Sequence, residues 1–240
     1  MKIKLLGWDS DFFKMKVGLL LFNNDVIWDD SEIKNWDLVY IFVDQKDMTH
    51  NLVAQAKKIP LVDEKVTYVM NLKKFKTHTD PSPKVHKYYS SVRDHEVIRI
   101  GIQSGIYSRF CVDPMFPPEK CKELYSIWIE KSISREIAKE VYVFENGENE
   151  IAGVITLGEK NNRADIGILA VDEKFRGQNV GSEIVNEAIH YSLQNNYPAL
   201  QVVTQKRNLS ACVFYQRCGF SQEQVINIYH FWKKNYDSVQ

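Results

Sequence analysis

The chain has 240 residues, of which 44% are hydrophobic and 26% are charged, as in an ordinary soluble globular protein. Lys and Arg together number 31, as do Asp and Glu, so no overall field favours nucleic acid or an anionic membrane as a partner. No apolar run reaches the length of a membrane span and the N-terminus lacks the features of a signal peptide, so we expect a cytoplasmic protein.

Residues 1–72 are predicted to form a small N-terminal α/β domain. Three short apolar runs are typical of buried strands, namely residues 17–22, 38–43 and 66–72. Between the last two, apolar residues at helical spacing indicate a helix that ends before Pro60.

Three aromatic residues, Trp8, Phe12 and Phe13, precede the first of these strands. A place in the core is the commoner role for such a cluster, and an aromatic platform for a nucleotide base is the alternative.

The composition changes in residues 73–95, because Lys73, Lys74 and Lys76 and the stretch Asp80–Lys84 are polar, basic and turn-rich. We interpret them as a linker.

Residues 96–240 are predicted to form a second, larger domain. The expected order is strand, helix, three strands, helix, strand, helix, strand. These elements are a strand at 97–102, a helix at 121–131, a hairpin of 141–144 and 151–157, a strand at 163–171, the helix after the loop at 176–182, a strand at 201–204, a helix around 214–215 and a last strand from 220.

The most informative stretch runs from Ile166 through the loop at 176–182 into the following helix. A glycine-bearing loop before a helix offers unpaired main-chain N–H groups and the positive end of the helix dipole, which together suit a phosphate. A Walker loop is excluded because Val180-Gly181-Ser182 contains no lysine. A dinucleotide fingerprint is excluded because only two of its three glycines, Gly177 and Gly181, are present.

The segment Arg176-Gly-Gln-Asn-Val-Gly181 resembles the Arg/Gln-x-x-Gly-x-Gly/Ala loop of the GCN5-related N-acetyltransferases (GNAT). Asn179 departs from that motif, but asparagine tolerates left-handed backbone geometry best among the other residues. The resemblance implies a central mixed, mostly antiparallel twisted sheet flanked by helices, and acetyl-CoA as the cosubstrate. The residues it implies for acetyl-CoA binding are Leu169, Ala170, Val171, Arg176, Gly177, Gln178, Asn179, Val180, Gly181, Ser182, Asn208 and Phe214.

A second stretch, residues 208–220, resembles the family's Asn-x-x-(A/S)-x-x-(F/L)-Tyr-x-x-x-Gly-Phe signature. Asn208 can cap the helix and Gly219 can end it in a left-handed conformation. The resemblance implies that Tyr215 is the general acid that protonates the departing thiolate. A positioned phenol can do this where the sulfur is desolvated. A buried core tyrosine is the alternative.

Two further groups of the reaction stay open at this point. The oxyanion needs an N–H donor, which the family takes from the strand before the loop, here 168–171. Candidates for the general base are Glu159, Asp165 and His190, and a chain of waters is equally compatible.

The four cysteines show no CxxC spacing or histidine pairing, so we expect reduced thiols and no bound metal. They are Cys111, Cys121, Cys212 and Cys218.

The acceptor is indicated by looser features. The opening Trp8–Phe13 segment and the stretch 108–132 resemble the TDP-fucosamine N-acetyltransferase subgroup. This resemblance implies the amine of a dTDP-linked 4-amino-4,6-dideoxy sugar as the acceptor, a role in cell-surface polysaccharide synthesis, and a homodimer. Arg109 and Ser108 are then candidate substrate contacts. The alternatives are a protein or peptide amine, and a non-catalytic acyl-CoA-binding module.

Overall fold

The computed structural model describes residues 2–23, 26–74 and 80–234. Within it the chain forms two compact units. Unit 1 contains the residues up to Val66 together with those from Gln224 onward, and unit 2 contains Thr67–Glu223. The predicted boundary at residue 72 lies close to the division after Val66, whereas residue 95 lies inside unit 2. The domain boundaries stay a prediction. No helix in the described ranges is both long and apolar enough to cross a membrane.

Unit 1 is a small α/β structure, as predicted. Strand β2 pairs in parallel with β3, while β1 pairs with β2, and β10 with β3, in antiparallel fashion. Its core contains Ile33, Val39, Ile41, Tyr229 and Phe231. The elements are β1 (Lys4–Leu5), α1 (Gly7–Phe13), β2 (Val17–Leu21), α2 (Asp30–Ile33), β3 (Leu38–Asp44) and α3 (Met48–Ala56), with parts of β4 (Leu61–Asn71) and β10 (Ser221–Trp232).

The aromatic cluster of α1 divides between the interior and the surface. Phe13 is buried, whereas Trp8 is 43% exposed and stacks on Phe12, with ring centroids 5.0 Å apart and an interplanar angle of 9°. The predicted core role is therefore confirmed for Phe13 and is wrong for Trp8. Phe13 is the buried residue of this seven-residue helix.

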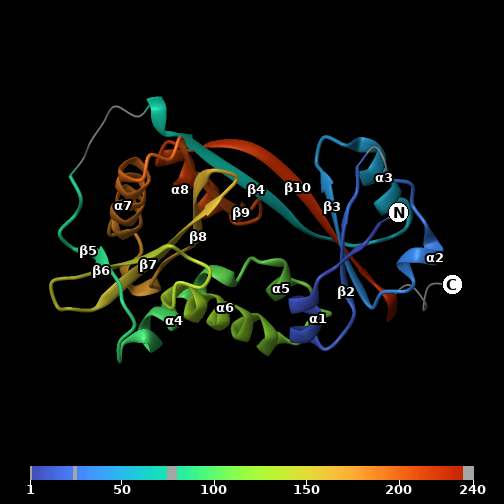
Figure 1. Cartoon of the computed structure of the whole chain (residues 1–240), viewed down its shortest axis with the longest axis horizontal. Helices are drawn as coiled ribbons and strands as arrows, with labels where there is room; N and C mark the ends of the chain where they lie inside the picture. Colours follow the sequence, from blue (N-terminus) through green and yellow to red (C-terminus); the bar gives the residue numbers. More distant parts are fainter. Residues whose placement is uncertain (1, 24–25, 75–79, 235–240) are drawn as a thin grey trace. The chain divides into compact units, whose positions relative to one another are not determined.

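Unit 2 contains a mixed sheet in the order β9-β8-β7-β6-β5. Only β8 and β9 pair in parallel among these strands, and the other neighbours are antiparallel. Helices α4 and α6 cover one face of the sheet and α7 covers the other (Figure 1). The expected fold class, a mostly antiparallel sheet flanked by helices, is confirmed.

Within the described residues, unit 2 contains five helices, three 3₁₀ turns and the five strands of this sheet. The helices are α4 (Asp94–Ile102), α5 (Arg109–Val112), α6 (Pro118–Ile133), α7 (Val180–Gln194) and α8 (Leu209–Arg217), with 3₁₀ turns η1 (Leu72–Lys74), η2 (Gln103–Gly105) and η3 (Glu173–Phe175). The strands are β5 (Val85–Lys87), β6 (Glu140–Glu145), β7 (Ile151–Lys160), β8 (Arg163–Val171) and β9 (Ala199–Gln205).

The strand predicted at 97–102 is wrong, because these residues belong to helix α4. Its buried residues are Val97, Ile100 and Gly101, which follow the three-to-four residue spacing of a helix. Gly101 lets α4 approach α6 closely, since a Cβ there would lie 2.1 Å from Cδ1 of Ile129. The run of β-branched residues favoured a strand, and tertiary packing against α6 overrode that preference.

The expectation of four reduced thiols is also corrected. Cys111 and Cys121 form a disulfide with their Cα atoms 5.2 Å apart, while Cys212 and Cys218 are free. Helix α5 carries Cys111, and a turn beginning at Asp113 reverses the chain so that the first turns of α6 lie beside it. A ten-residue separation without a CxxC pattern gives no sign of this in the sequence.

The predicted linker, residues 73–95, falls within unit 2. Residues 85–87 form the edge strand β5, which pairs with β6, and Tyr88 after it is buried. Lys76, which the sequence assigned to the linker, lies outside the described residues.

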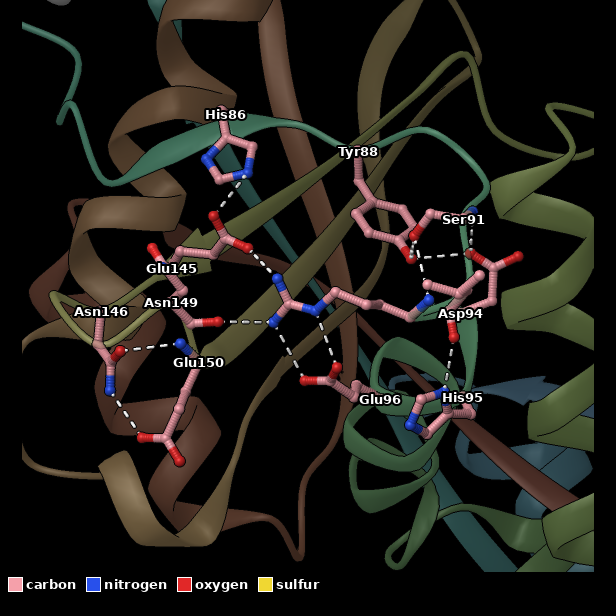
Figure 2. Close-up of polar contacts among 12 residues, drawn as sticks. His86, Tyr88, Ser91, Asp94, His95, Glu96, Glu145, Asn146, Asn149 and Glu150 are labelled. Carbon is pink, nitrogen blue, oxygen red and sulfur yellow. Dashed lines mark hydrogen bonds and ion pairs between the residues drawn. The ribbon is translucent and has the colours of Figure 1, made fainter.

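The segment after β5 is held by a polar network around Arg93, whose partners Glu96, Glu145 and Asn149 are labelled in Figure 2. Arg93 donates through Nε and Nη2 to the two carboxylate oxygens of Glu96, at 2.8 and 3.1 Å. It also donates to Glu145 at the end of β6 and to the carbonyl of Asn149 in the β6–β7 hairpin. His86 on β5 lies 3.3 Å from the other oxygen of Glu145. One guanidinium therefore ties the start of α4 to the hairpin.

We expect Arg93→Ala to lower the free energy of unfolding by about 1.5–3 kcal/mol, the range for hydrogen bonds to charged groups. The hydrogen bond from Arg93 holds the pKa of Glu96 below its ordinary value of 4.5 in the folded protein. This stabilisation is therefore present above about pH 4.5 and is lost as the pH falls through the lower folded value. Urea unfolding at about pH 7 and at about pH 3 measures both effects.

The matched control is Arg163→Ala, which removes a single ion pair to Glu223 with both side chains partly exposed. It should change stability by less than about 1 kcal/mol. Equal losses for the two variants would contradict the central role of Arg93.

Candidate functional site

Unit 2 contains a cavity of about 530 Å³. Its walls are the second half of β8, the end of β9, the loop before α7 with the first turn of α7, helix α8, and the η2–α6 region. Both sequence stretches that carried the functional prediction therefore open into one space.

The cavity lies where two neighbouring strands stop pairing. Strands β8 and β9 pair through Ala164, Asp165 and Ile166 of β8, and no pair follows Ile166–Val202. Beyond that point residues 168–171 of β8 and 203–205 of β9 line the cavity from its two sides. The main-chain edge of β8 is thus left open toward the cavity.

The direction of the main chain along β8 can be read from its hydrogen bonds. The N–H of Ile168 donates to Thr156 Oγ1 and the N–H of Asp172 to the carbonyl of Ala152, both belonging to β7. Main-chain groups of successive strand residues point to alternate edges. The N–H and C=O groups of Leu169 and Val171 therefore point away from β7, toward the cavity.

The loop at 176–182 has the backbone geometry that its sequence predicted. Gly177 has φ +78° and Asn179 has φ +64°, so both adopt the left-handed region. Asn179 occupies the N-cap position of α7 but makes no side-chain capping bond to the helix. The first N–H groups of α7, from Val180 to Ser182, lie at the positive end of a 15-residue helix and border the cavity.

Gly181 is favoured by close packing rather than by its φ angle. A Cβ at this position would lie 3.1 Å from Cζ of Phe214 and 3.6 Å from Cγ2 of Val171. The ring of Phe214 on α8 thus fits against the bare main chain of α7. The absence of a side chain at 181 brings the two helices together beside the cavity.

Arg176 reaches back over the loop to the open edge of β8. Its Nε donates to the carbonyl of Val171 at 3.2 Å, and its Nη2 donates to Oε1 of Gln103 at 3.1 Å. The same oxygen of Gln103 accepts from the N–H of Glu173 at 3.2 Å. Gln103 is a site residue that the sequence reasoning missed, because it lies about 70 residues before the loop and belongs to no motif.

The start of the loop is fixed by Asp172, which is only 1% exposed. Burial alone would raise the pKa of its carboxyl group, but the N–H of Lys174 and the guanidinium of Arg99 outweigh burial and lower that pKa. Arg99 Nη2 lies 2.6 Å from Asp172 Oδ2. Arg99 of helix α4 and Gln103, the first residue after α4, therefore both contact the loop region.

Helix α8 presents Tyr215 to the cavity. Asn208 caps the helix by accepting from the N–H of Ala211 at 3.2 Å, and Gly219 follows its end with φ +94°, both as predicted. Tyr215 is 5% exposed and lines the cavity. Burial raises its pKa above the ordinary value of 10, and Cys218 and Cys212 raise it further, so the phenol is protonated at neutral pH.

Most of the predicted site residues line the cavity. The exceptions are Gln178, Ser108 and Arg109. Gln178 bonds within the loop through the carbonyl of Lys174, and Ser108 is buried with its hydroxyl toward the sulfur of Cys111. The guanidinium of Arg109 packs over the ring of Phe110 at 4.4 Å.

The three candidate bases lie elsewhere. Glu159 contacts Lys139 and Tyr197, Asp165 accepts from Gln201, and His190 is on α7; none of them lines the cavity. Among the described residues that line it there is no Asp, Glu or His.

The end of the cavity formed by η2 and α6 is aromatic. It is lined by Ile106, Tyr107, Tyr125 and Trp128, with Tyr125 and Trp128 in edge contact at 5.1 Å between ring centroids. The sequence predicted the helix over 121–131 that carries Tyr125 and Trp128, but it did not point to Tyr125 or to Tyr107 as part of a site. The fold shows that all three border the cavity.

Comparison with known proteins agrees with this geometry. Residues 107–220 match the model of the Acetyltransferase (GNAT) family. The spore coat polysaccharide biosynthesis protein SpsD of Bacillus subtilis (strain 168) is 23% identical over 125 residues, which are 52% of this chain and 43% of that protein. The chain therefore spans less than half the length of this curated relative.

Solved structures share the fold at low identity. A GCN5-related N-acetyltransferase from Sphaerobacter thermophilus superposes with a TM-score of 0.60 and 11% identity, over 82% of this chain and 60% of that one. A conserved protein of unknown function from Staphylococcus epidermidis ATCC 12228 gives a TM-score of 0.63 and 13% identity, over 90% and 83%. Residues 107–220 thus match the GNAT family, and the solved structures agree with this chain in fold.

Proposed function

We propose that the protein transfers the acetyl group of acetyl-CoA to an amine. The observation that carries the proposal is that one cavity joins an anion-binding helix start, an open strand edge and a buried, protonated phenol. A sensor would need the first two features and has no use for the third. The proposal therefore favours an enzyme over an acyl-CoA-binding module.

The cavity offers a chemically suitable set of groups for the diphosphate and for the pantetheine arm of acetyl-CoA. The N–H groups from Gly177 to Ser182 suit the diphosphate. The N–H and C=O groups of Leu169 and Val171 suit the two amides of pantetheine, which would add to β8 like another strand. Asn208 and Phe214 line the same side, next to Tyr215.

The proposed reaction balances with one protein acid. The amine nitrogen attacks the thioester carbonyl carbon, the C–N bond forms, and the C–S bond breaks as Tyr215 gives its proton to the departing thiolate. The proton lost by the amine passes to water, because the described lining offers no carboxylate or imidazole, and a proton from water restores the phenol.

For the acceptor we propose a nucleotide-linked amino-dideoxy sugar, with a dTDP-4-amino-4,6-dideoxyhexose as the first choice. The relative from Bacillus subtilis is named for spore coat polysaccharide biosynthesis. The acceptor end of the cavity is aromatic and uncharged, which suits a sugar or a base by stacking. A basic peptide, the runner-up, would be better served by carboxylates. Arg109 and Ser108 do not line the cavity and are not part of this proposal.

Replacing Tyr215 by Phe should lower kcat by about 100-fold or more, because a general acid contributes on that scale. The Kd of acetyl-CoA should stay within about threefold of the native value, since the strand edge and loop are unchanged. Stopped-flow thiol release and calorimetric titration measure the two quantities.

Tyr142→Phe is the control, because Tyr142 is likewise buried with a raised pKa but does not line the cavity. It should turn over at the native rate. Native turnover in the Tyr215 variant would remove the acid from the mechanism.

Asn179 provides a test of the loop. Alanine pays the full steric cost of the left-handed conformation, about 1–2 kcal/mol, whereas glycine adopts it freely. Asn179→Ala should therefore raise the Kd of acetyl-CoA about five- to tenfold, and Asn179→Gly should stay within about twofold. Equal affinities for the two variants would show that the loop geometry does not control binding.

The acceptor is tested with purified protein, acetyl-CoA and two panels of amines. We expect thiol release with amino-sugar nucleotides and rates at least about tenfold lower with lysine-rich peptides. Release with peptides and none with any amino-sugar nucleotide would overturn the acceptor while leaving acetyl transfer intact.

A further inference from the structure

Thr156, on β7, lies outside the cavity but contacts the strand that forms its wall. The pairing of β7 with β8 shifts register here, because Thr156 is opposite Ile168 while the next residue, Leu157, is opposite Ile166. Gly167 is left without a partner in the ladder, which is the geometry of a β-bulge. This bulge directly follows Ile166, where the pairing of β8 with β9 also ends.

A bulge leaves a main-chain N–H group without its usual carbonyl acceptor on the neighbouring strand. Here a side-chain oxygen takes the place of that carbonyl. The N–H of Ile168 donates to Oγ1 of Thr156 at 2.9 Å, in a buried position. Thr156 itself is 3% exposed, so water does not readily substitute for its hydroxyl. A buried N–H without an acceptor is unfavourable, so this bond favours the bulged register over others.

Gly167 completes the arrangement. A Cβ at this position would lie 2.9 Å from Oγ1 of Thr156, a distance that real side chains avoid. The hydroxyl can therefore reach Ile168 because residue 167 has no side chain. Gly167 also lines the cavity, so the bulge is part of its wall.

The bulge decides which main-chain groups face the cavity. With the N–H of Ile168 held toward β7, alternation turns the N–H and C=O groups of Leu169 and Val171 to the open edge. A shift by one residue would exchange the two sets. The hydroxyl of Thr156 thus determines which main-chain groups of β8 face the cavity, although Thr156 itself does not line it.

We propose that Thr156 is a positioning residue for the pantetheine arm of CoA. Its hydroxyl fixes the bulge at Gly167 and so aims the main-chain groups of Leu169 and Val171 at the arm. This inference rests on the proposed function, since it concerns how the same site recognises acetyl-CoA.

The test compares Thr156→Val, which keeps the shape but removes the acceptor, with Thr156→Ser, which keeps the acceptor. Two ligands are titrated calorimetrically, CoA and 3′-phospho-ADP, which carries the diphosphate but lacks pantetheine. We expect Thr156→Val to raise the Kd of CoA about tenfold and to leave that of 3′-phospho-ADP within about twofold. Thr156→Ser should stay within about threefold of native for both.

Ser192→Ala is the control for loss of a buried hydroxyl, because the hydroxyl of Ser192 on α7 donates to the carbonyl of Ala188 in the same helix and Ser192 does not line the cavity. It should bind both ligands as the native protein does. Hydrogen exchange measured by NMR adds a readout on the free protein, in which the Ile168 amide should exchange faster in Thr156→Val than in Thr156→Ser.

Native CoA affinity in Thr156→Val, or an equal loss for both ligands, would overturn the inference while the proposed function stands. A native protein that binds neither ligand would instead overturn the proposed function and this inference with it. Should the valine variant not fold, Thr156→Ala gives the same comparison.

Discussion

The pairing of strands β8 and β9 ends at Ile166, and the architecture of the site depends on the separation of the two strands beyond that residue. A sheet ordinarily satisfies the main-chain groups of an interior strand on both edges. Here one edge of residues 168–171 faces a cavity, with the start of α7 at one end and Tyr215 of α8 nearby. Hydrogen-bonding capacity is thus concentrated in a space otherwise lined largely by apolar and aromatic groups.

Helix α4 connects this region to the rest of unit 2. Arg93 ties its start to the β6–β7 hairpin, Arg99 holds Asp172, and Gln103 just after the helix holds Arg176 and Glu173. The three contacts follow one another at intervals of four to six residues along the chain. The loop is therefore supported by contacts from α4 and the residue that follows it, and not through its own residues alone.

Much of this could be predicted from the sequence where local signals dominate. The left-handed Asn179, the cap at Asn208 and the bounds of β8 follow from residue type and spacing, and the structure agrees with them. Helix α4 could not be predicted because β-branched residues favour a strand until α6 packs against them. Gln103, the Cys111–Cys121 disulfide and the bulge at Gly167 depend on contacts between separate segments, which composition and periodicity do not report.

The contact between Arg176 and the carbonyl of Val171 has an energetic consequence for ligand entry. That carbonyl points to the open edge of β8, so an incoming amide donor meets an oxygen that already holds a guanidinium. A carbonyl oxygen has two lone pairs, so the incoming amide N–H either shares the oxygen of Val171 with Arg176 or displaces Arg176 from it. Displacement replaces one hydrogen bond by another and adds little net attraction at the oxygen. It does, however, release the guanidinium charge of Arg176 close to the start of α7. Under the proposed function, the gain in affinity would then come from the charge set free to meet a diphosphate.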